Sequence, residues 1–313
     1  MSPTECRLCR SQETTQLARG AARYARCRRC AAVTRLMSAD EYAALVVSYD
    51  PDPLLLARDP VELRGLLAVP HKIGFLRRAL GGRESPAGLR FLDIGCGQGG
   101  YLLAARELGL EVEGVEPSEA HSAIARDVFG LRVRTCYFTR DLFPPRSFDL
   151  VMLSHVIEHI YDPDAFLASI LPVMRPGGKL VIVTPNSDSL IARASGAWWT
   201  MLKPADHVSL MSSRTLSFMP SLARARVVTR TSEYPSEPAM ALLAAARDMV
   251  RHRLRPAEST VAATTRPGDQ TRRRARRKLL DAALAVVSLP AHRLTRLSNK
   301  QATLVAEITL EAP

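Results

Sequence analysis

Short apolar runs alternate with helix-forming segments through the middle of this 313-residue chain, from residue 86 to residue 238. The apolar runs have the length of buried strands, whereas the segments between them, such as residues 101–108, have helical composition with apolar residues on one face. The predicted strands are residues 91–94, 110–116, 131–136, 148–153, 179–186, 226–228 and 302–310. This alternation predicts an α/β fold with a largely parallel, doubly wound sheet.

The same pattern divides the chain into five segments. The first segment contains two cysteine pairs and a short helix that starts at Asp40. The second segment is a helical linker, which Pro70 divides into two helices. A helical insertion separates the last strand from the rest of the sheet. The predicted segments are 1–50, a cysteine-rich module; 51–85, the linker; 86–238, the α/β core; 239–297, the insertion; and 298–313, the final core strand.

The first core strand ends in a glycine-rich turn, Asp93-Ile94-Gly95-Cys96-Gly97-Gln98-Gly99-Gly100, that leads into a helix. Glycines permit a sharp turn and let a ligand lie against the backbone. The helix N-terminus behind them offers free N–H groups, and Asp93 is placed to accept hydrogen bonds from a cationic amino group. Dinucleotide-binding enzymes use a similar turn, so the turn alone does not identify a ligand.

A second acid, Glu116, ends the next predicted strand. In nucleotide-binding folds of this kind, an acid at that position holds the ribose hydroxyls of a nucleoside. NAD enzymes share the acid, so Glu116 supports a nucleoside without choosing one. A glycine-rich turn that binds no ligand is the weaker interpretation once Glu116 is included.

Further motifs follow in order along the chain, at residues 147–151, 154–163, 175–180 and 184–186. With the glycine turn they resemble class I S-adenosylmethionine (SAM)-dependent methyltransferases. The resemblance is to the superfamily of ubiquinone-pathway O-methyltransferases and of zinc-ribbon methyltransferases that modify sugars and natural products. It implies a Rossmann-like sheet of seven strands, with the last strand antiparallel beside the sixth. The cofactor-binding residues that it implies are Asp93, Gly95, Cys96, Gly97, Gly99, Glu116, Pro117, Asp141, Ser154 and His155.

Four of the six cysteines form two Cys-x-x-Cys pairs, Cys6 with Cys9 and Cys27 with Cys30. Two such pairs at this separation indicate a tetrahedral zinc site, and so short a module needs a metal because it buries little apolar surface. Cysteine fills all four ligand positions, so the zinc is expected to be structural. Four unrelated thiols are the alternative, and a redox dithiol lacks its βαβ context.

Methyl transfer to a hydroxyl or an enolisable carbon requires removal of a proton, a task that suits histidine near neutral pH. His159 follows His155 at i+4, so a helix would place both on one face, and Glu158 would orient an imidazole. His207 lies in a loop expected to cover the acceptor. We therefore predict His159, His207 and Glu158 as catalytic residues, with structural bracing as the alternative for His159. His121 is expected on a solvent-facing helix.

The net charge of +12 is concentrated in residues 1–35 and 266–278. The remainder is neutral, which argues against DNA and weakens the case for RNA. A basic run leading into an apolar helix over 272–297 suits an anionic membrane surface, but a helical hairpin beside the active site or in a homodimer is the favoured interpretation. The chain shows no apolar run of membrane-spanning length and no apolar signal segment, so a cytoplasmic protein is expected.

The sequence therefore predicts a SAM-dependent methyltransferase acting on a small molecule, either a sugar (including a nucleotide-linked one) or another secondary metabolite. An RNA methyltransferase that uses the zinc ribbon and the arginine patches is the second interpretation. Against it, Thr184-Pro185-Asn186 does not resemble the Asn-Pro-Pro-Tyr motif of amino-group nucleic-acid methyltransferases. A non-catalytic SAM-binding protein is the third.

Overall fold

The computed structural model describes residues 5–47, 62–63, 65, 67–81, 86–203, 205–232 and 301–310. The insertion expected at 239–297, with its basic segment 272–297, lies outside the described residues, as does part of the linker expected at 51–85. The described part of the chain contains one sheet of seven strands and one of four.

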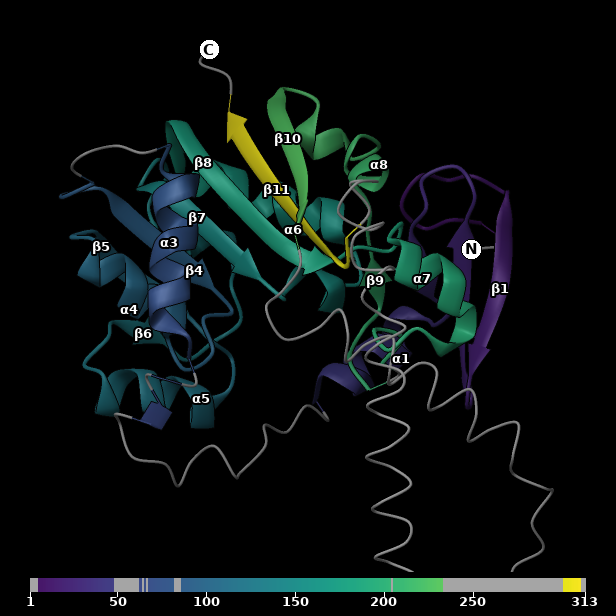
Figure 1. The fold of residues 1–313 in the computed structure, drawn as a ribbon, viewed down its shortest axis with the longest axis horizontal. Coiled ribbons are helices and arrows are strands. Elements are labelled where there is room, and N and C mark those ends of the chain that lie inside the picture. The colour runs from purple at the N-terminus through teal and green to yellow at the C-terminus, as the bar shows by residue number, and fades with distance from the viewer. Residues whose placement is uncertain are drawn as a thin grey trace, which may run out of the picture.

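The seven-stranded sheet has the strand order β10-β11-β8-β7-β4-β5-β6. Its parallel strands are β4 (Arg90–Ile94), β5 (Glu111–Val115), β6 (Val133–Arg134), β7 (Phe148–Ser154) and β8 (Met174–Pro185). β11 (Thr303–Leu310) lies between β8 and β10 (Ala225–Ser232) and runs antiparallel to both (Figure 1). The Rossmann-like seven-stranded sheet with an antiparallel last strand is thus confirmed.

Helices cover both faces of this sheet. Neighbouring residues of one strand point to opposite faces, so Phe91 and Leu92 belong to different core clusters, as do Leu150 and Val151. The first cluster is covered by α3 (Val69–Ala79), α4 (Gly100–Glu107) and the π-helical turn Ile124–Val128 that continues α5 (Glu119–Ala123). The second is covered by α6 (Pro163–Ile170) and α8 (Ser213–Leu216). The sheet is therefore doubly wound, as predicted.

Polar caps fix where several helices begin. Ser118 accepts a hydrogen bond from the His121 amide at 3.3 Å before α5, and Asp162 accepts one from the Ala165 amide at 3.1 Å before α6. The remaining short elements are α7 (Leu190–Ser195) and the 3₁₀ turns Arg140–Leu142, Ile157–His159, Leu171–Val173, Gly196–Trp198 and Pro220–Leu222. None of the helices in the described ranges has the length and apolar character needed to cross a membrane.

Two local expectations are wrong. Residues 155–159 do not form a helix: His155 has a left-handed backbone (φ 57°) and a 3₁₀ turn follows it, so His155 and His159 share no helical face. The strand predicted at residues 179–186 also begins earlier than expected. α6 stops at Ile170, and Pro176-Gly177-Gly178 belongs to the first half of β8, where the register with β7 shifts.

The N-terminal module carries the four-stranded sheet. Its strands β1 (Thr14–Arg19), β2 (Ala22–Cys27) and β3 (Val33–Arg35) precede α1 (Ala39–Val47), and its fourth strand, β9 (Ser209–Leu210), comes from a distant part of the chain. Trp199 and Leu202 are buried against Tyr24 of this sheet. The module therefore shares a sheet and a core with residues that follow β8 (Figure 1).

Gly114 of β5 has no space for a side chain, which gives a test of the packing between β5 and α4. A Cβ atom there would lie 2.7 Å from Leu102 Cδ1 and 2.8 Å from Cys96 Sγ. We expect Gly114→Val to lower the free energy of unfolding by about 1–3 kcal/mol or more. Gly74→Ala, in α3 where nothing crowds the new methyl, should instead stabilise by about 0.5–1 kcal/mol. Urea unfolding measures both, and equal effects would contradict this account.

Candidate active site

The turn after β4 is built from glycines with left-handed backbones. Gly95 and Gly99 have φ values of 72° and 85°, and a Cβ on Gly95 would approach Val156 Cγ2 to 2.4 Å. The turn therefore requires glycine for its backbone conformation and for the packing of Val156. It delivers the chain directly into α4, whose first residue is Gly100.

A cavity of about 350 Å³, called here the glycine-turn cavity, opens between this turn, α3 and α5. It is lined by Leu67, Lys72, Asp93, Gly95, Cys96, Gly97, Gln98, Gly100, Tyr101, His121 and Ser154. Three of its polar atoms are buried and have no hydrogen-bond partner among the described residues: Asp93 Oδ1, Gln98 Nε2 and His121 Nε2. Because buried polar groups are almost always hydrogen-bonded, these atoms fit a polar ligand that supplies both donors and acceptors.

The buried Asp93 and the half-buried Lys72 interact electrostatically in this cavity. Burial raises the pKa of Asp93 to about 8; Lys72 opposes the rise, and Glu116 adds to it. Burial also lowers the pKa of Lys72, while Asp93 raises it. Lys72 Nζ donates to the Leu67 carbonyl at 2.5 Å and lies 5.1 Å from the Tyr101 ring centre. The cavity thus offers one carboxyl group and one amino group to a zwitterionic ligand.

Glu116 closes the other side of the glycine turn. Its Oε2 accepts a hydrogen bond from the Gly97 amide at 2.8 Å, and its Oε1 accepts one from the Ser118 amide at 2.9 Å. These backbone donors fix a buried carboxylate at the end of β5. His121, expected on a solvent-facing helix, instead lines the cavity one helical turn beyond Ser118.

The structure brings together most, but not all, of the residues predicted to bind a cofactor. Asp93, Gly95, Cys96, Gly97 and Ser154 line the cavity; Gly99 shapes its turn, and Pro117 follows Glu116. Asp141 does not reach it, since Asp141 is exposed and lines a separate cavity of about 440 Å³ beside Arg140 and Phe143. Lys72 escaped the sequence reasoning because only the packing of α3 on α4 brings it to the glycine turn.

A second cluster, called here the histidine group, consists of His155, Glu158, His159 and His207. The Glu158 side chain is fully buried, and its Oε1 lies 3.0 Å from His155 Nδ1. Thr184 Oγ1 of β8 donates to the other oxygen at 3.0 Å. Burial alone would raise the pKa of Glu158, but the hydrogen bond from His155 and the nearby imidazoles lower it overall. Glu158 therefore orients His155, whereas the sequence left open which imidazole it would orient.

His159 and His207 pack edge to face, with ring centres 4.9 Å apart. His159 Nδ1 lies 3.1 Å from the Asp206 carbonyl, and His207 Nδ1 lies 2.7 Å from the Met201 carbonyl. A carbonyl only accepts, so each Nδ1 atom carries a proton that it donates. His207 is buried, and its pKa is lowered to about 4. Burial is the main cause, and the neighbouring His159 is the second.

The N-terminal module is hydrogen-bonded to this histidine group. Val208, next to His207, donates its amide to the Glu158 carbonyl at 2.8 Å, and its own carbonyl accepts from the Arg35 amide at 2.9 Å. Arg7 donates to the same carbonyl at 3.0 Å and stacks on Tyr161 at 4.1 Å. The first Cys-x-x-Cys pair is thus linked to His207 through Arg7, its second residue.

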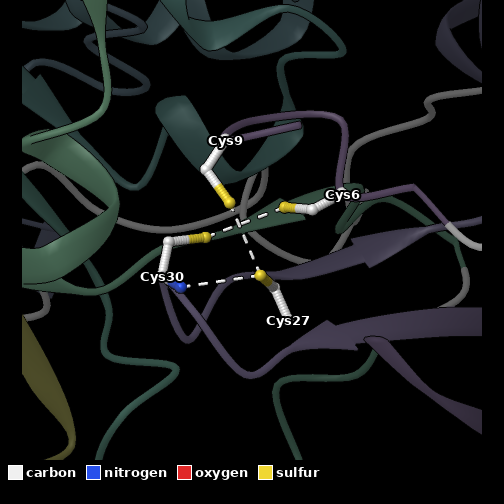
Figure 2. A group of neighbouring side chains, drawn as sticks. All are labelled: Cys6, Cys9, Cys27 and Cys30. Carbon is white, nitrogen blue, oxygen red and sulfur yellow. Dashed lines mark hydrogen bonds between the residues drawn. The ribbon is translucent and has the colours of Figure 1, made fainter. Parts of the chain in front are cut away.

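The four cysteines converge in this module, as Figure 2 shows. The sulfurs of Cys6 and Cys30 are 3.7 Å apart and those of Cys9 and Cys27 are 3.5 Å apart; all four residues are buried and none forms a disulfide. Thiolates at about 2.3 Å from a tetrahedral zinc lie roughly 3.8 Å from one another. The spacing therefore suits one metal ion with four sulfur ligands.

Comparison with known proteins gives one family. Residues 68–219 match the model described as a methyltransferase domain. A ubiquinone biosynthesis O-methyltransferase of Rhodopseudomonas palustris is 35% identical, over 37% of this chain and 51% of its own. The enzyme of that name from Maricaulis maris is 31% identical, over 42% of this chain and 58% of its own. The chain thus spans about half the length of the curated relatives it matches.

Solved structures give more distant likenesses. A SAM-dependent methyltransferase from Archaeoglobus fulgidus superposes with a TM-score of 0.48 at 21% identity, covering 79% of this chain and 94% of that chain. A 1,6-didemethyltoxoflavin-N1-methyltransferase from Burkholderia thailandensis has the same TM-score at 15% identity, covering 96% and 99%. The fold assignment rests on the strand order and not on these superpositions.

The buried carboxyl of Asp93 predicts a pH-dependent stability. Its pKa of about 8 lies above the ordinary 3.8, so between these pH values the folded protein binds more protons than the unfolded chain. The free energy of unfolding therefore falls as the pH rises through this range. Asp93→Asn removes this pH dependence, and its melting temperature at pH 8 should exceed that of the wild type by about 2–4 °C for each kcal/mol of the loss that it removes.

Asp127→Asn, which alters an exposed acid in the turn after α5, is the matched control. Calorimetric scans from pH 5 to pH 8.5 should show that the wild type and this control lose stability together, whereas Asp93→Asn loses less. Parallel curves for all three proteins would contradict the assignment.

Proposed function

We propose that this chain, whose residues 68–219 form a class I SAM-dependent methyltransferase domain, transfers a methyl group to a hydroxyl of a small-molecule acceptor. The observation that carries the proposal is the glycine-turn cavity, where three buried polar atoms, one of them on Asp93, have no hydrogen-bond partner among the described residues. Asp93 and Glu116 stand at the carboxyl ends of neighbouring parallel strands, where ligands bind in sheets of this kind. When bound there, SAM supplies a methyl made electrophilic by a sulfonium. The names of the curated relatives support oxygen as the methylated atom.

The charges of the cavity suggest the orientation of the cofactor. Glu116, fixed by two backbone amides, is proposed to accept the ribose hydroxyls. Asp93 is proposed to take the ammonium of the methionine part, and Lys72 its carboxylate. The backbone of the glycine turn lies along the nucleoside, and Ser154 marks the methionine end. Asp141 has less support as an adenine ligand because it lines the other cavity.

For the acceptor we propose a sugar or another secondary metabolite. The support is the cysteine module, which the sequence shares with zinc-ribbon methyltransferases of that type. The histidine group lies at the carboxyl ends of β7 and β8, since Ser154 lines the cavity and Thr184 bonds to Glu158, and ligands bind at such strand ends in open α/β sheets. The predicted catalytic residues His159, His207 and Glu158 belong to this group, together with His155, and we assign removal of the acceptor's proton to it.

Cys6, Cys9, Cys27 and Cys30 are proposed to hold one structural zinc ion. The sulfur spacing and the burial of all four residues support this set. Zinc held there would fix both Cys-x-x-Cys turns, and with them Arg7, whose side chain bonds to the Val208 carbonyl. The metal would therefore stabilise the loop that carries His207 and take no part in the chemistry.

Glu116→Ala tests the cofactor site. The substitution removes a buried carboxylate whose hydrogen bond to the ligand contributes about 1.5–3 kcal/mol to binding. SAM binding should therefore weaken roughly tenfold or more. Isothermal calorimetry with SAM measures the affinity. Glu119→Ala, which removes an exposed acid that pairs with Arg126 on the same helix, should bind SAM as the wild type does. Unchanged affinity in Glu116→Ala removes the ribose assignment, and tight NADH binding without SAM binding removes the proposed function.

The zinc proposal has its own measurement. Elemental analysis of protein purified without chelator should find one zinc per chain, and Cys27→Ser should lose that stoichiometry. Because the module is linked to the loop of His207, we expect turnover in Cys27→Ser to fall about tenfold or more, as when a supporting residue is lost, with a smaller effect on SAM affinity. Cys136→Ser, outside the cluster, is the control. Wild-type protein without stoichiometric metal would end the claim.

A further inference from the structure

The three imidazoles of the histidine group differ in burial and in what holds them. His207 is 5% exposed in its side chain, its pKa is lowered to about 4, and its ring packs against His159. The His159 ring bonds to a backbone carbonyl, makes that ring contact, and has a nitrogen within 4.8 Å of a Glu158 carboxylate oxygen. The His155 side chain is 38% exposed, and a carboxylate holds its Nδ1. Among these three rings, His155 is the one that combines access from outside with a hydrogen bond to the buried carboxylate at 3.0 Å.

We infer that His155, oriented by Glu158, is the catalytic residue that takes the proton from the acceptor. The inference rests on the proposed methyl transfer and names the residue within the histidine group that performs it. His159 and His207 then act as positioning residues, because their edge-to-face contact and their carbonyl bonds hold the loop of Asp206 against the 3₁₀ turn that carries Glu158.

The place of His155 in the chain puts it beside the cofactor. Ser154 before it lines the glycine-turn cavity, and Val156 after it packs on Gly95 of the glycine turn. Its backbone is left-handed, with φ of 57°, and its amide donates to the Val183 carbonyl at 2.8 Å. A non-glycine residue held in this conformation costs about 1–3 kcal/mol, and such residues concentrate at functional sites.

Glu158 supplies what a histidine base requires. Its Oε1 accepts the Nδ1–H of His155 at 3.0 Å, which leaves the lone pair on Nε2, and Thr184 holds Oε2 at 3.0 Å. The carboxylate is fully buried, so it cannot turn away into solvent. A carboxylate in this position fixes the tautomer of a histidine and stabilises the imidazolium that forms when the base takes a proton.

The step balances with one base and no further reactant. The acceptor's O–H bond breaks as its proton moves to His155 Nε2, and the oxygen's electron pair forms a bond to the methyl carbon. The carbon–sulfur bond breaks, its electron pair stays on sulfur, and the sulfonium becomes a neutral thioether. His155 then releases its proton to solvent, while Glu158 stays ionised throughout.

The test uses the full chain with SAM and two probe acceptors, catechol and the more acidic 4-nitrocatechol. His155→Ala should bind SAM within about twofold of the wild type but lose about 10²–10⁴-fold in turnover of catechol, the usual contribution of a general base. The loss should be smaller with 4-nitrocatechol, which ionises without help. Added imidazole should restore part of the turnover of His155→Ala and none of that of His159→Ala or His207→Ala. His71→Gln, an exposed histidine in α3, is the unchanged control.

The outcomes separate this inference from the proposed function. A wild-type chain that does not bind SAM overturns the proposed function itself. A chain that binds SAM and methylates catechol, but keeps its turnover within threefold in His155→Ala, or is rescued by imidazole only in His159→Ala, overturns the role of His155. Glu158→Gln should reduce turnover about tenfold or more without this rescue, as expected for a positioning residue.

If the chain binds SAM but methylates neither probe, the protonation state and tautomer of the His155 ring test the inference. Long-range ¹H–¹⁵N spectra of the S-adenosylhomocysteine complex at pH 8 should show His155 neutral, with its proton on Nδ1, and Glu158→Gln should disturb this state. A His155 that is charged at pH 8, or that carries its proton on Nε2, overturns the inference.

Discussion

The buried carboxylate of Glu158 is the constraint on which the candidate site depends. An ionised group out of contact with water is costly unless charged or hydrogen-bonding partners surround it, so its neighbours have little freedom. One oxygen bonds to His155 and the other to Thr184 of β8. Its main-chain carbonyl accepts from Val208, the residue before β9. A single residue in a 3₁₀ turn thus joins the ends of β7 and β8 to the strand that completes the N-terminal sheet.

The glycine-turn cavity follows a different rule, because its polar groups are left incomplete. Asp93 and Lys72 compensate only in part for the cost of each other's burial. Burial raises the pKa of Asp93 and lowers that of Lys72, so it favours the neutral form of each. Gln98 and His121 each leave a buried nitrogen without a partner among the described residues. Unsatisfied groups of this kind reduce the stability of the folded chain and favour a ligand that completes them. Glu116, by contrast, is held by two backbone amides and keeps its geometry without a ligand.

The N-terminal module supports the site more than a separate domain would. Its sheet is completed by β9, its core includes Trp199, and Arg7 reaches from the first cysteine pair to the carbonyl beside His207. Further hydrogen bonds link Arg26 to the Ser187 carbonyl at 3.0 Å, and Ser212 Oγ to the Cys30 carbonyl at 2.7 Å. Geometry at the cysteines is therefore coupled by short contacts to geometry at the histidine group, although the two lie far apart in sequence.

The sequence by itself determined what depends on local pattern. The apolar runs predicted the strands, and the glycines after Asp93 predicted the turn. Gly95 in that turn has a positive φ, and Val156 packs too close to it to leave room for a side chain. The repeated cysteine spacing indicated the four-sulfur cluster. Tertiary structure decided what depends on long-range contacts. Lys72 reaches the glycine turn only through the packing of α3 on α4, and β9 joins β3 across most of the chain. His155 points its ring at Glu158 from a left-handed residue followed by a 3₁₀ turn, where the sequence predicted a helix, and so short a segment does not encode that conformation.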